Sequence, residues 1–371
     1  MNPVLFSHAY LARCYSANYA EAQLKFRQRC SDQSEHSHYQ EFVYRETGPN
    51  DEQLSTAVSW QGDPDAACVL VLQSATHGVE GFAGSAIQLD TLETIKKEDL
   101  PAGVAVLYIH AINPYGFAWL RRVNEQGVDL NRNFVDFNRP LPENTDYARL
   151  ADSILPADLA DWDKATRTLA NYRDEFGQQA LELAVSGGQY QFAEGLFYGG
   201  KQPSQSRINL EKIIAQFELH KRQSVAVIDI HTGLGPFGYG EVICDHPPGS
   251  IGVKRARQWY GDSVTEPALG SSTSVPKQGL IDYLWHQQLE DRVCFVTLEF
   301  GTYSVEQMFE VLRRDNFLHH QTVDWAADST QQVKQAMRHN FYPESADWQE
   351  IVLQRGRQCV RQALQGLSEQ L

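Results

Sequence analysis

A histidine and a glutamate three residues apart follow a long apolar run of the chain. His77 and Glu80 lie directly after the run at residues 68–72. An imidazole and a carboxylate at the end of a buried strand are a common way for an α/β enzyme to present metal ligands to a crevice. Taken alone the pair is weak evidence, because His-x-x-Glu is also compatible with a solvated helix start, where a carboxylate favours the positive end of the helix dipole.

A second histidine, far along the chain, completes a set of metal ligands. His231 follows the apolar run at residues 225–230 and opens into a glycine-rich loop. A catalytic zinc takes three ligands of this kind and leaves one position for water. His77, Glu80 and His231 therefore predict one Zn²⁺ per chain. The alternative for His231 is a histidine at a strand end that only hydrogen-bonds the backbone.

A further carboxylate ends another apolar run. Glu299 follows residues 293–298, and burial at such a place raises the pKa of a carboxyl group. Hydrolysis of an amide needs a group that takes a proton from water and passes it to the leaving nitrogen. We predict this role for Glu299; a solvent-exposed glutamate at a strand end is the alternative if it is considered alone.

A cluster of arginines and amides lies between these motifs. Arg122 is followed by the segment that contains Asp129, Asn131 and Arg132. Guanidinium and amide groups suit the recognition of a carboxylate and the polarisation of a carbonyl oxygen. Asp129 can accept the second ring N–H of a metal-bound histidine and so fix its tautomer. Arginines in a surface loop are the alternative reading of this cluster.

Short apolar runs separated by helical segments must position these residues. Runs at residues 68–72, 104–109, 225–230 and 293–298 predict buried strands, and residues 56–60 predict an edge strand. Strands that alternate with helices indicate βαβ units, whose chemistry gathers at one edge of the sheet. Residues 83–97 and 347–367 predict helices. We expect one domain over residues 1–371, with a helical and glycine-rich insertion at residues 140–223 that covers the crevice.

Composition narrows the possible partners. The 371 residues carry a formal net charge of −15, which disfavours nucleic acid and anionic membrane surfaces. Six scattered cysteines without a Cys-x-x-Cys pair predict buried thiols in a reducing compartment. We find neither a secretion signal nor a run of about 18 apolar residues. We therefore expect a cytoplasmic protein that binds neither nucleic acid nor membrane; the oligomeric state stays open.

Together the motifs resemble the zinc carboxypeptidase superfamily, in the family's order, over about residues 68–301. The resemblance implies a three-layer α/β/α sandwich on a mixed, mostly parallel sheet of about eight strands. It also implies that His77, Glu80 and His231 bind zinc, and that Glu299 is the general acid/base. The matching motifs are His77-x-x-Glu80, Asn113-Pro114-x-Gly116, Arg122-x-Asn124, Asp129-Leu130-Asn131-Arg132, Ile230-His231 and Leu298-Glu299.

The same resemblance assigns substrate contacts. Arg122 would polarise the scissile carbonyl, and Asn131 with Arg132 would hold the terminal carboxylate of the substrate. Ile281 would line the side-chain pocket. The fuller strings around His77, Asn113 and His231 are similar to a bacterial branch of the superfamily known mainly as a domain of unknown function.

The chain departs from the digestive-type carboxypeptidases at one position. Those enzymes carry a mobile tyrosine before a Gly-x-Ile-Asp-like stretch, and alignment on residues 279–282 places Ser274 there. This departure puts peptide-type clamping of the substrate in doubt. Tyr198, Tyr239 and Tyr283 are the candidates to take over that role.

Three functions are consistent with the sequence. The first is a zinc-dependent hydrolase that cleaves an amide bond next to a free carboxylate, like a carboxypeptidase acting on short peptides or peptide-like metabolites. The second is an N-acyl-amino-acid deacylase, because segments at Asp129, Asp229 and Glu299 also resemble aspartoacylase and succinylglutamate desuccinylase. The third is a metal-binding module without catalysis.

Overall fold

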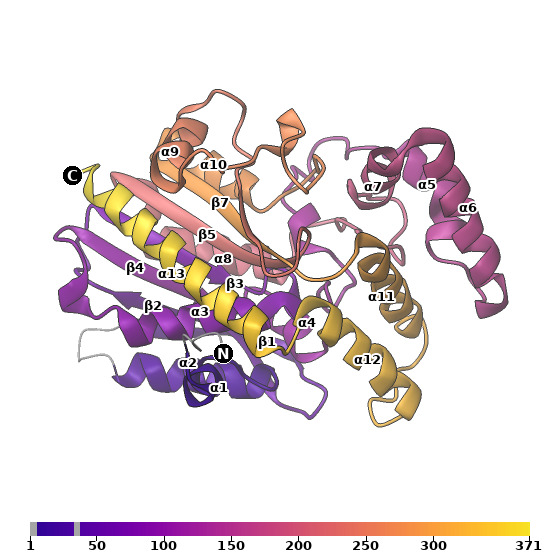
Figure 1. The fold of residues 1–371 in the computed structure, drawn as a ribbon, viewed down its shortest axis with the longest axis horizontal. Helices are drawn as coiled ribbons and strands as arrows, with labels where there is room; N and C mark the ends of the chain where they lie inside the picture. Colours follow the sequence, from indigo (N-terminus) through magenta and orange to yellow (C-terminus); the bar gives the residue numbers. More distant parts are fainter. Residues whose placement is uncertain (1–5, 33–37) are drawn as a thin grey trace.

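The computed structural model describes residues 6–32 and 38–371, and these form a mixed sheet flanked by helices (Figure 1). The seven strands lie in the order β1-β2-β4-β3-β5-β7-β6. Their bounds are β1 His38–Thr47, β2 Gln53–Gln61, β3 Cys68–Ser74, β4 Val104–His110, β5 Ser224–Gly233, β6 Gly240–Ile243 and β7 Val293–Gly301.

The middle of the sheet is parallel and its two margins are antiparallel. β4, β3, β5 and β7 run in one direction, whereas β2 and β6 run against their neighbours. β1 pairs antiparallel with β2 and so returns to the main direction. Because the carboxyl ends of parallel strands meet at one edge, the residues that follow β3, β4, β5 and β7 are brought together.

Helices cover both faces of the sheet. Alternate residues of β3 enter two different cores: Leu70 and Leu72 pack in one, and Val69 and Val71 in the other. One face is covered by α1 His8–Cys14, α2 Tyr19–Asp32, α3 Gly81–Thr94, α9 Ile251–Tyr260 and α13 Ala346–Ser368. The opposite face is covered by α8 Gln205–Gln216 and α10 Asp282–Leu289.

A third hydrophobic cluster stands beside the sheet. It joins five helices that Figure 1 shows grouped at the right of the molecule, and it also includes Val79 between His77 and Glu80. These helices are α5 Thr145–Ile154, α6 Trp162–Phe176, α7 Gln178–Ser186, α11 Val305–Leu318 and α12 Asp328–Phe341. The short helix α4 Pro114–Ala118 follows β4.

The α/β/α architecture expected from the sequence is confirmed, with differences at the margins. The described residues form seven strands where about eight were expected. The edge position expected for residues 56–60 is wrong: β2 is paired on both sides, by β1 and β4, and all but its first residue are buried. β1 was missed because its burial pattern, mostly exposed or half-buried, carries little apolar signal.

Several other expectations are met or refined. The helices expected at residues 83–97 and 347–367 correspond to α3 and α13. All six cysteines are buried. Within residues 140–223, α8 packs against the sheet, whereas α5, α6 and α7 belong to the third cluster. Among the described helices there is none with the length and hydropathy needed to cross a bilayer.

Candidate metal centre and active site

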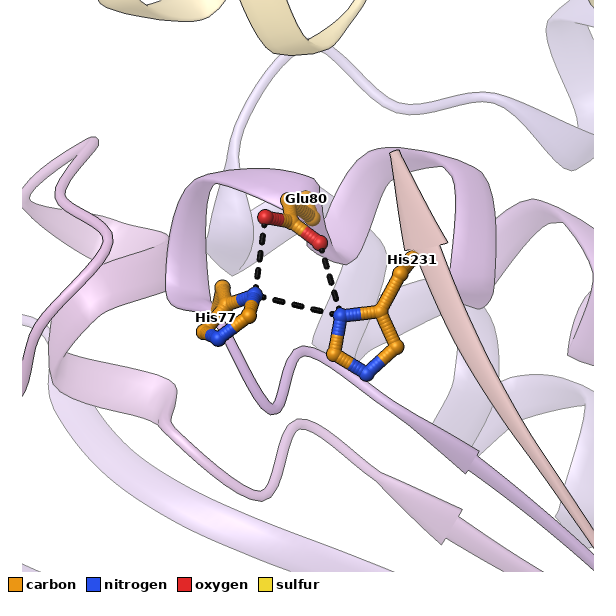
Figure 2. Close-up of side chains that lie close together, drawn as sticks. All are labelled: His77, Glu80 and His231. Carbon is orange, nitrogen blue, oxygen red and sulfur yellow. Dashed lines mark hydrogen bonds and ion pairs between the residues drawn. The ribbon is translucent and has the colours of Figure 1, made fainter. Parts of the chain in front are cut away.

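Two histidines and a glutamate converge at the carboxyl edge of the sheet (Figure 2). His77 Nδ1 lies 2.9 Å from Glu80 Oε1, and His231 Nδ1 lies 3.0 Å from Glu80 Oε2. The two Nδ1 atoms are 3.1 Å apart. One potential ligand atom from each residue lies within 4.8 Å of the others, and all three side chains are buried. The structure thus brings His231 from β5 to the His77–Glu80 pair, which lies far earlier in the sequence.

Each imidazole has a carboxylate at its other ring nitrogen. Asp229 Oδ2 lies 2.7 Å from His231 Nε2, and Asp129 Oδ1 lies 3.3 Å from His77 Nε2. A carboxylate favours the tautomer with the proton on Nε2, which leaves each Nδ1 with a free lone pair. Two lone pairs and a carboxylate would then face one point, and this arrangement needs a positive charge there: either a proton on His231, whose pKa is raised well above its ordinary value, or a metal ion. This donor set fits Zn²⁺.

The charges of the three groups fit the same interpretation. Burial would raise the pKa of Glu80, but His77 and His231 hold it below its ordinary value. Burial would lower the pKa of His231, but Asp229 and Glu80 raise it well above its ordinary value. Glu80 is therefore an anion that also accepts the backbone N–H of Thr232 at 3.1 Å. A buried anion between two imidazoles is suited to bind a divalent cation.

Backbone contacts hold the turn that carries His77 and Glu80. Gly78 packs so closely that a Cβ atom on it would lie 2.0 Å from the carbonyl carbon of Gly116. Its N–H donates to the carbonyl of Arg122 at 3.2 Å, and that of Val79 to the carbonyl of Arg121 at 2.9 Å. Only glycine fits such a close approach of two backbones.

The Asn113-Pro114-Tyr115-Gly116 motif packs against this turn. Asn113 caps α4 by accepting the N–H of Gly116 at 2.9 Å, and its Nδ2 donates to the carbonyl of Arg122 at 3.2 Å. Pro114 suits the first turn of the helix, where no backbone donor is needed. The motif recognised in the sequence thus positions Arg122 and the metal-ligand turn together.

Glu299 lies beside His77, Glu80 and His231, the three candidate metal ligands that we call the metal-ligand cluster. It is the direct partner of His231 in the parallel pairing of β5 and β7. Its Oε1 accepts the N–H of Leu234 at 2.9 Å. Burial, with a further contribution from Glu80, raises its pKa to about 7. A carboxyl group with such a pKa can both accept and release a proton near neutral pH.

Arg122 borders both the metal-ligand cluster and the cavity. Its Nε donates to Asp129 Oδ2 at 2.9 Å, and its Nη1 lies 3.5 Å from Glu80 Oε1. The guanidinium also lies over the ring of Phe197, 5.1 Å from its centroid. Burial would raise the pKa of Asp129, but Arg122 and Arg132 hold it well below its ordinary value. Asp129 therefore holds Arg122 and faces His77 as an anion.

Asn131 and Arg132 are placed differently from each other. Asn131 Oδ1 accepts the N–H of Ile281 at 2.8 Å. The guanidinium of Arg132 is buried and donates to main-chain carbonyls: Nε and Nη2 to Ser186 at 3.1 and 2.5 Å, and Nη1 to Asn131 at 2.5 Å. Both residues border the cavity. Burial, aided by Arg122, lowers the pKa of Arg132 to about 10.

The expectation for Ile281 is wrong. Its side chain is 1% exposed and packs in the core under the sheet with Leu284 and Trp285, because it precedes α10 on the side that faces the sheet. The preceding residue, Leu280, is among those that line the cavity. Ile281 contributes its backbone N–H, which holds Asn131.

The three candidate tyrosines lie outside the set of described residues that line the cavity. Tyr198 is buried, Tyr239 is 48% exposed and Tyr283 is 36% exposed. The hydroxyl of Tyr283 donates to the carbonyl of Lys277 at 3.1 Å. Ser274, the residue that aligns with the family's mobile tyrosine, does line the cavity, and so does Lys277 from the same segment.

Sequence reasoning gave no role to four acidic or basic residues near the site. Asp229 was detectable, because it lies two residues before His231 and therefore on the same side of β5. Lys277 and Asp245 line the cavity from loops without a recognisable pattern. Glu241 accepts hydrogen bonds from Ser272 Oγ at 2.8 Å and the N–H of Thr273 at 3.2 Å, and so anchors the loop that carries Lys277.

The cavity has two chemically different walls. α7 and α11 supply the apolar residues of the lining, Leu181, Val185, Met308, Phe309 and Leu312, which we call the apolar wall, although Gln178, Glu182 and Glu306 from the same helices also border the cavity. The other carries Asn131, Arg132, Asp245 and Lys277. The metal-ligand cluster, Arg122 and Glu299 also line this cavity, so a bound molecule can touch both walls and the metal-ligand cluster.

Comparison with known proteins identifies a family. A family model described as "Protein of unknown function (DUF2817)" matches residues 15–355. The chain belongs to this family. The DUF2817 match agrees with the unknown-function branch expected from the sequence. A search among curated proteins finds no match for this DUF2817 chain.

Solved structures share the fold of this DUF2817 protein. Carboxypeptidase A from Helicoverpa armigera matches with a TM-score of 0.51 and 14% identity, over 95% of this chain and 75% of that one. Thrombin activatable fibrinolysis inhibitor matches with a TM-score of 0.55 and 9% identity, over 98% and 77%. The chain therefore has the zinc carboxypeptidase fold.

Proposed function

We propose that this DUF2817 protein is a zinc-dependent hydrolase that cleaves an amide bond next to a free carboxylate. The observation that carries the proposal is the convergence of His77, Glu80 and His231 in a cavity that Glu299 also lines. A zinc ion held by these three residues supplies a Lewis acid that polarises a carbonyl and makes water more acidic. The fold shared with carboxypeptidase A is consistent with this chemistry.

The protein's own residues divide the remaining work. Glu299 takes a proton from the attacking water and delivers it to the leaving nitrogen, a role that its raised pKa supports. Arg122 directs its guanidinium at the scissile carbonyl and stabilises the negative charge that develops there. Asp129 and Asp229 hold the tautomers of His77 and His231.

The free carboxylate of the substrate meets the polar wall of the cavity. Asn131 borders this wall, and its side-chain oxygen is already engaged by the N–H of Ile281. Its amide nitrogen is therefore directed to donate. Arg132 supports Asn131 through its hydrogen bond to the Asn131 carbonyl. We expect that amidation of the substrate's carboxylate removes most activity, because the half-buried amide donor of Asn131 then loses its charged partner.

A hydrolysis screen tests the proposal. Zinc-loaded protein would be offered short peptides and N-acyl amino acids, each with a free and with an amidated carboxylate. Equal rates on free and amidated compounds would contradict the requirement for a carboxylate. Zinc content well below one per chain, with no activity after metal addition, would favour a metal-binding module without catalysis.

An N-acyl-amino-acid deacylase is the second candidate. The apolar wall from α7 and α11 favours it, because Leu181, Met308 and Phe309 offer an acyl chain a hydrophobic surface inside the same cavity. The screen separates the two candidates, since a deacylase prefers acylated amino acids over dipeptides with the same leaving residue. A clear preference for dipeptides would contradict the second candidate.

A further inference from the structure

Lys277 is a cation inside the cavity with no carboxylate in contact. Its Nζ donates to Ser274 Oγ and, at 3.0 Å, to the carbonyl of Val275. Both acceptors are uncharged, and no described carboxylate lies within ion-pair distance of Lys277. Burial lowers its pKa to about 8, and Arg132 contributes, whereas Asp245 and Glu299 act in the opposite direction from further away. The ammonium therefore faces the cavity with its charge uncompensated by contact.

Arg132 is less able to meet a substrate's carboxylate than Lys277. Its side chain is 0% exposed, and each of its three guanidinium nitrogens donates to the carbonyl of Ser186 or Asn131. The ring of Phe197 covers the guanidinium at 5.6 Å. A ligand would have to replace hydrogen bonds that already satisfy Arg132. Lys277 borders the same wall and donates to only one main-chain carbonyl, that of Val275, and to the hydroxyl of Ser274.

Asp245 is the anion that complements Lys277. It lines the cavity just after β6, and among the described residues its carboxylate forms neither a hydrogen bond nor an ion pair. Burial raises its pKa, while Lys277, Arg132 and His231 act through space to lower it. Asp245 is half-buried, and a partly desolvated carboxylate without a partner is stabilised by a ligand that brings a positive charge.

We propose that the polar wall selects a leaving amino acid that carries a carboxylate and a positively charged side chain. Lys277 takes the carboxylate together with Asn131, and Asp245 takes the side-chain ammonium. This inference rests on the proposed hydrolase function and names its substrate class, a peptide or N-acyl compound that ends in lysine, ornithine or a similar diamino acid. The apolar wall then accommodates the acyl side of the scissile bond.

The charges of Lys277 and Asp245 disfavour leaving residues whose side chains are apolar or acidic. A norleucine residue has the length of lysine but leaves Asp245 without a partner, and a glutamate residue brings a second negative charge towards it. Hydrogen bonds to charged groups are worth about 1.5–3 kcal/mol, which corresponds to a preference of about 10- to 150-fold. We expect lysine to exceed norleucine by such a factor in kcat/KM, and glutamate to be the poorest of the three.

Matched substrates and variants test this selection. One acyl group would be linked to lysine, norleucine or glutamate, with kcat and KM measured for each on the zinc-loaded protein. Asp245→Asn should reduce the lysine preference to within about threefold, mainly through KM. Lys277→Met should lower kcat/KM for compounds with a free carboxylate far more than for the amidated compounds. Asp152→Asn on α5 and Lys254→Met on α9, both exposed, are the matched controls.

Binding of free lysine provides a readout that does not need catalysis. Calorimetry with L-lysine and L-norleucine on the full chain should show tighter binding of lysine, lost in Asp245→Asn, while thermal unfolding verifies that each variant is folded. If no compound is hydrolysed, the proposed function fails and the calorimetry still decides the inference. Hydrolysis without a lysine preference, or lysine binding that survives both Asp245→Asn and Lys277→Met, would overturn the inference alone.

Discussion

Asp229 should control how tightly the metal binds, although it is not expected to touch the metal. Its Oδ2 lies 2.7 Å from His231 Nε2, and Thr76 Oγ1 lies 2.9 and 3.1 Å from its two carboxylate oxygens. The carboxylate can accept from both residues at once. In Asp229→Asn only one oxygen remains, and if it stays with Thr76 the amide N–H₂ faces His231 Nε2.

That exchange favours the wrong tautomer of His231. An amide donor at Nε2 moves the ring proton to Nδ1, which is the atom that faces Glu80 and His77. Loss of such a partner behind a metal-bound histidine typically costs about 10- to 100-fold in metal affinity, or about 1.4–2.7 kcal/mol. We expect Asp229→Asn to lose zinc affinity in this range.

Competition with a chromophoric chelator would measure the effect. Metal-free native protein, Asp229→Asn and the exposed control Asp152→Asn would be titrated with zinc, and urea unfolding of the metal-free forms would test whether the fold is retained. The affinity should fall only in Asp229→Asn. An Asp229→Asn protein that folds normally and binds zinc as tightly as the native protein would refute the argument that this carboxylate sets the tautomer.

Four further predictions address catalysis and stability. Glu299→Gln should lower kcat/KM by about 100- to 10,000-fold with zinc content unchanged; retained turnover would assign the proton transfer elsewhere. Burial raises the pKa of Glu299 to about 7, and a bound cation would lower it. In the native protein kcat/KM should therefore decrease as the pH falls, with an apparent pKa of about 7 or below. Burial lowers the pKa of His110 to about 3, so its imidazole stays neutral in the folded state, whereas in the unfolded state it takes up a proton below about pH 6.5. Between pH 7 and pH 5 the free energy of unfolding of the native protein should therefore fall by about 2 kcal/mol more than that of His110→Gln, as measured by urea unfolding. Asp315→Asn should destabilise the fold by about 3–5 kcal/mol in the same assay, because Arg121 at 3.0 Å and Lys334 at 2.6 Å lose their buried counter-ion; a change below about 1 kcal/mol would contradict this.

The sequence revealed the parts of the fold that have strong patterns. The buried strands β3, β4, β5 and β7 are continuous apolar runs, and the polar residues that follow them predicted one shared edge. β1 escaped because an exposed edge strand has no such run. The antiparallel β6, only four residues long, is likewise too short to produce a pattern.

In the candidate site, too, some residues could be recognised from the sequence and others could not. His77, Glu80 and His231 were recognisable because their types and spacing suit one metal, and the structure brings them together. Ile281 was misassigned because alignment fixes a position in the chain but not the face to which a side chain turns. Lys277 and Asp245 come from loops, where spacing carries no information about which side chains meet in space.

The dipeptide Arg121-Arg122 connects the metal-ligand turn to the cavity wall. Its two carbonyls accept the N–H groups of Gly78 and Val79, so the dipeptide holds the turn that presents Glu80. The two side chains diverge: Arg122 turns to Asp129 and Glu80, and Arg121 turns to Asp315 on α11.

Because α11 also supplies Met308, Phe309 and Leu312 to the apolar wall, a shift of this helix is transmitted to Arg121 through a buried ion pair. The ion pair of Arg121 with Asp315 thus connects α11, which lines the acyl side of the cavity, to the turn that carries His77 and Glu80. A substitution on α11 that disturbs Asp315 should therefore affect metal affinity as well as substrate binding, although it lies in a different part of the chain.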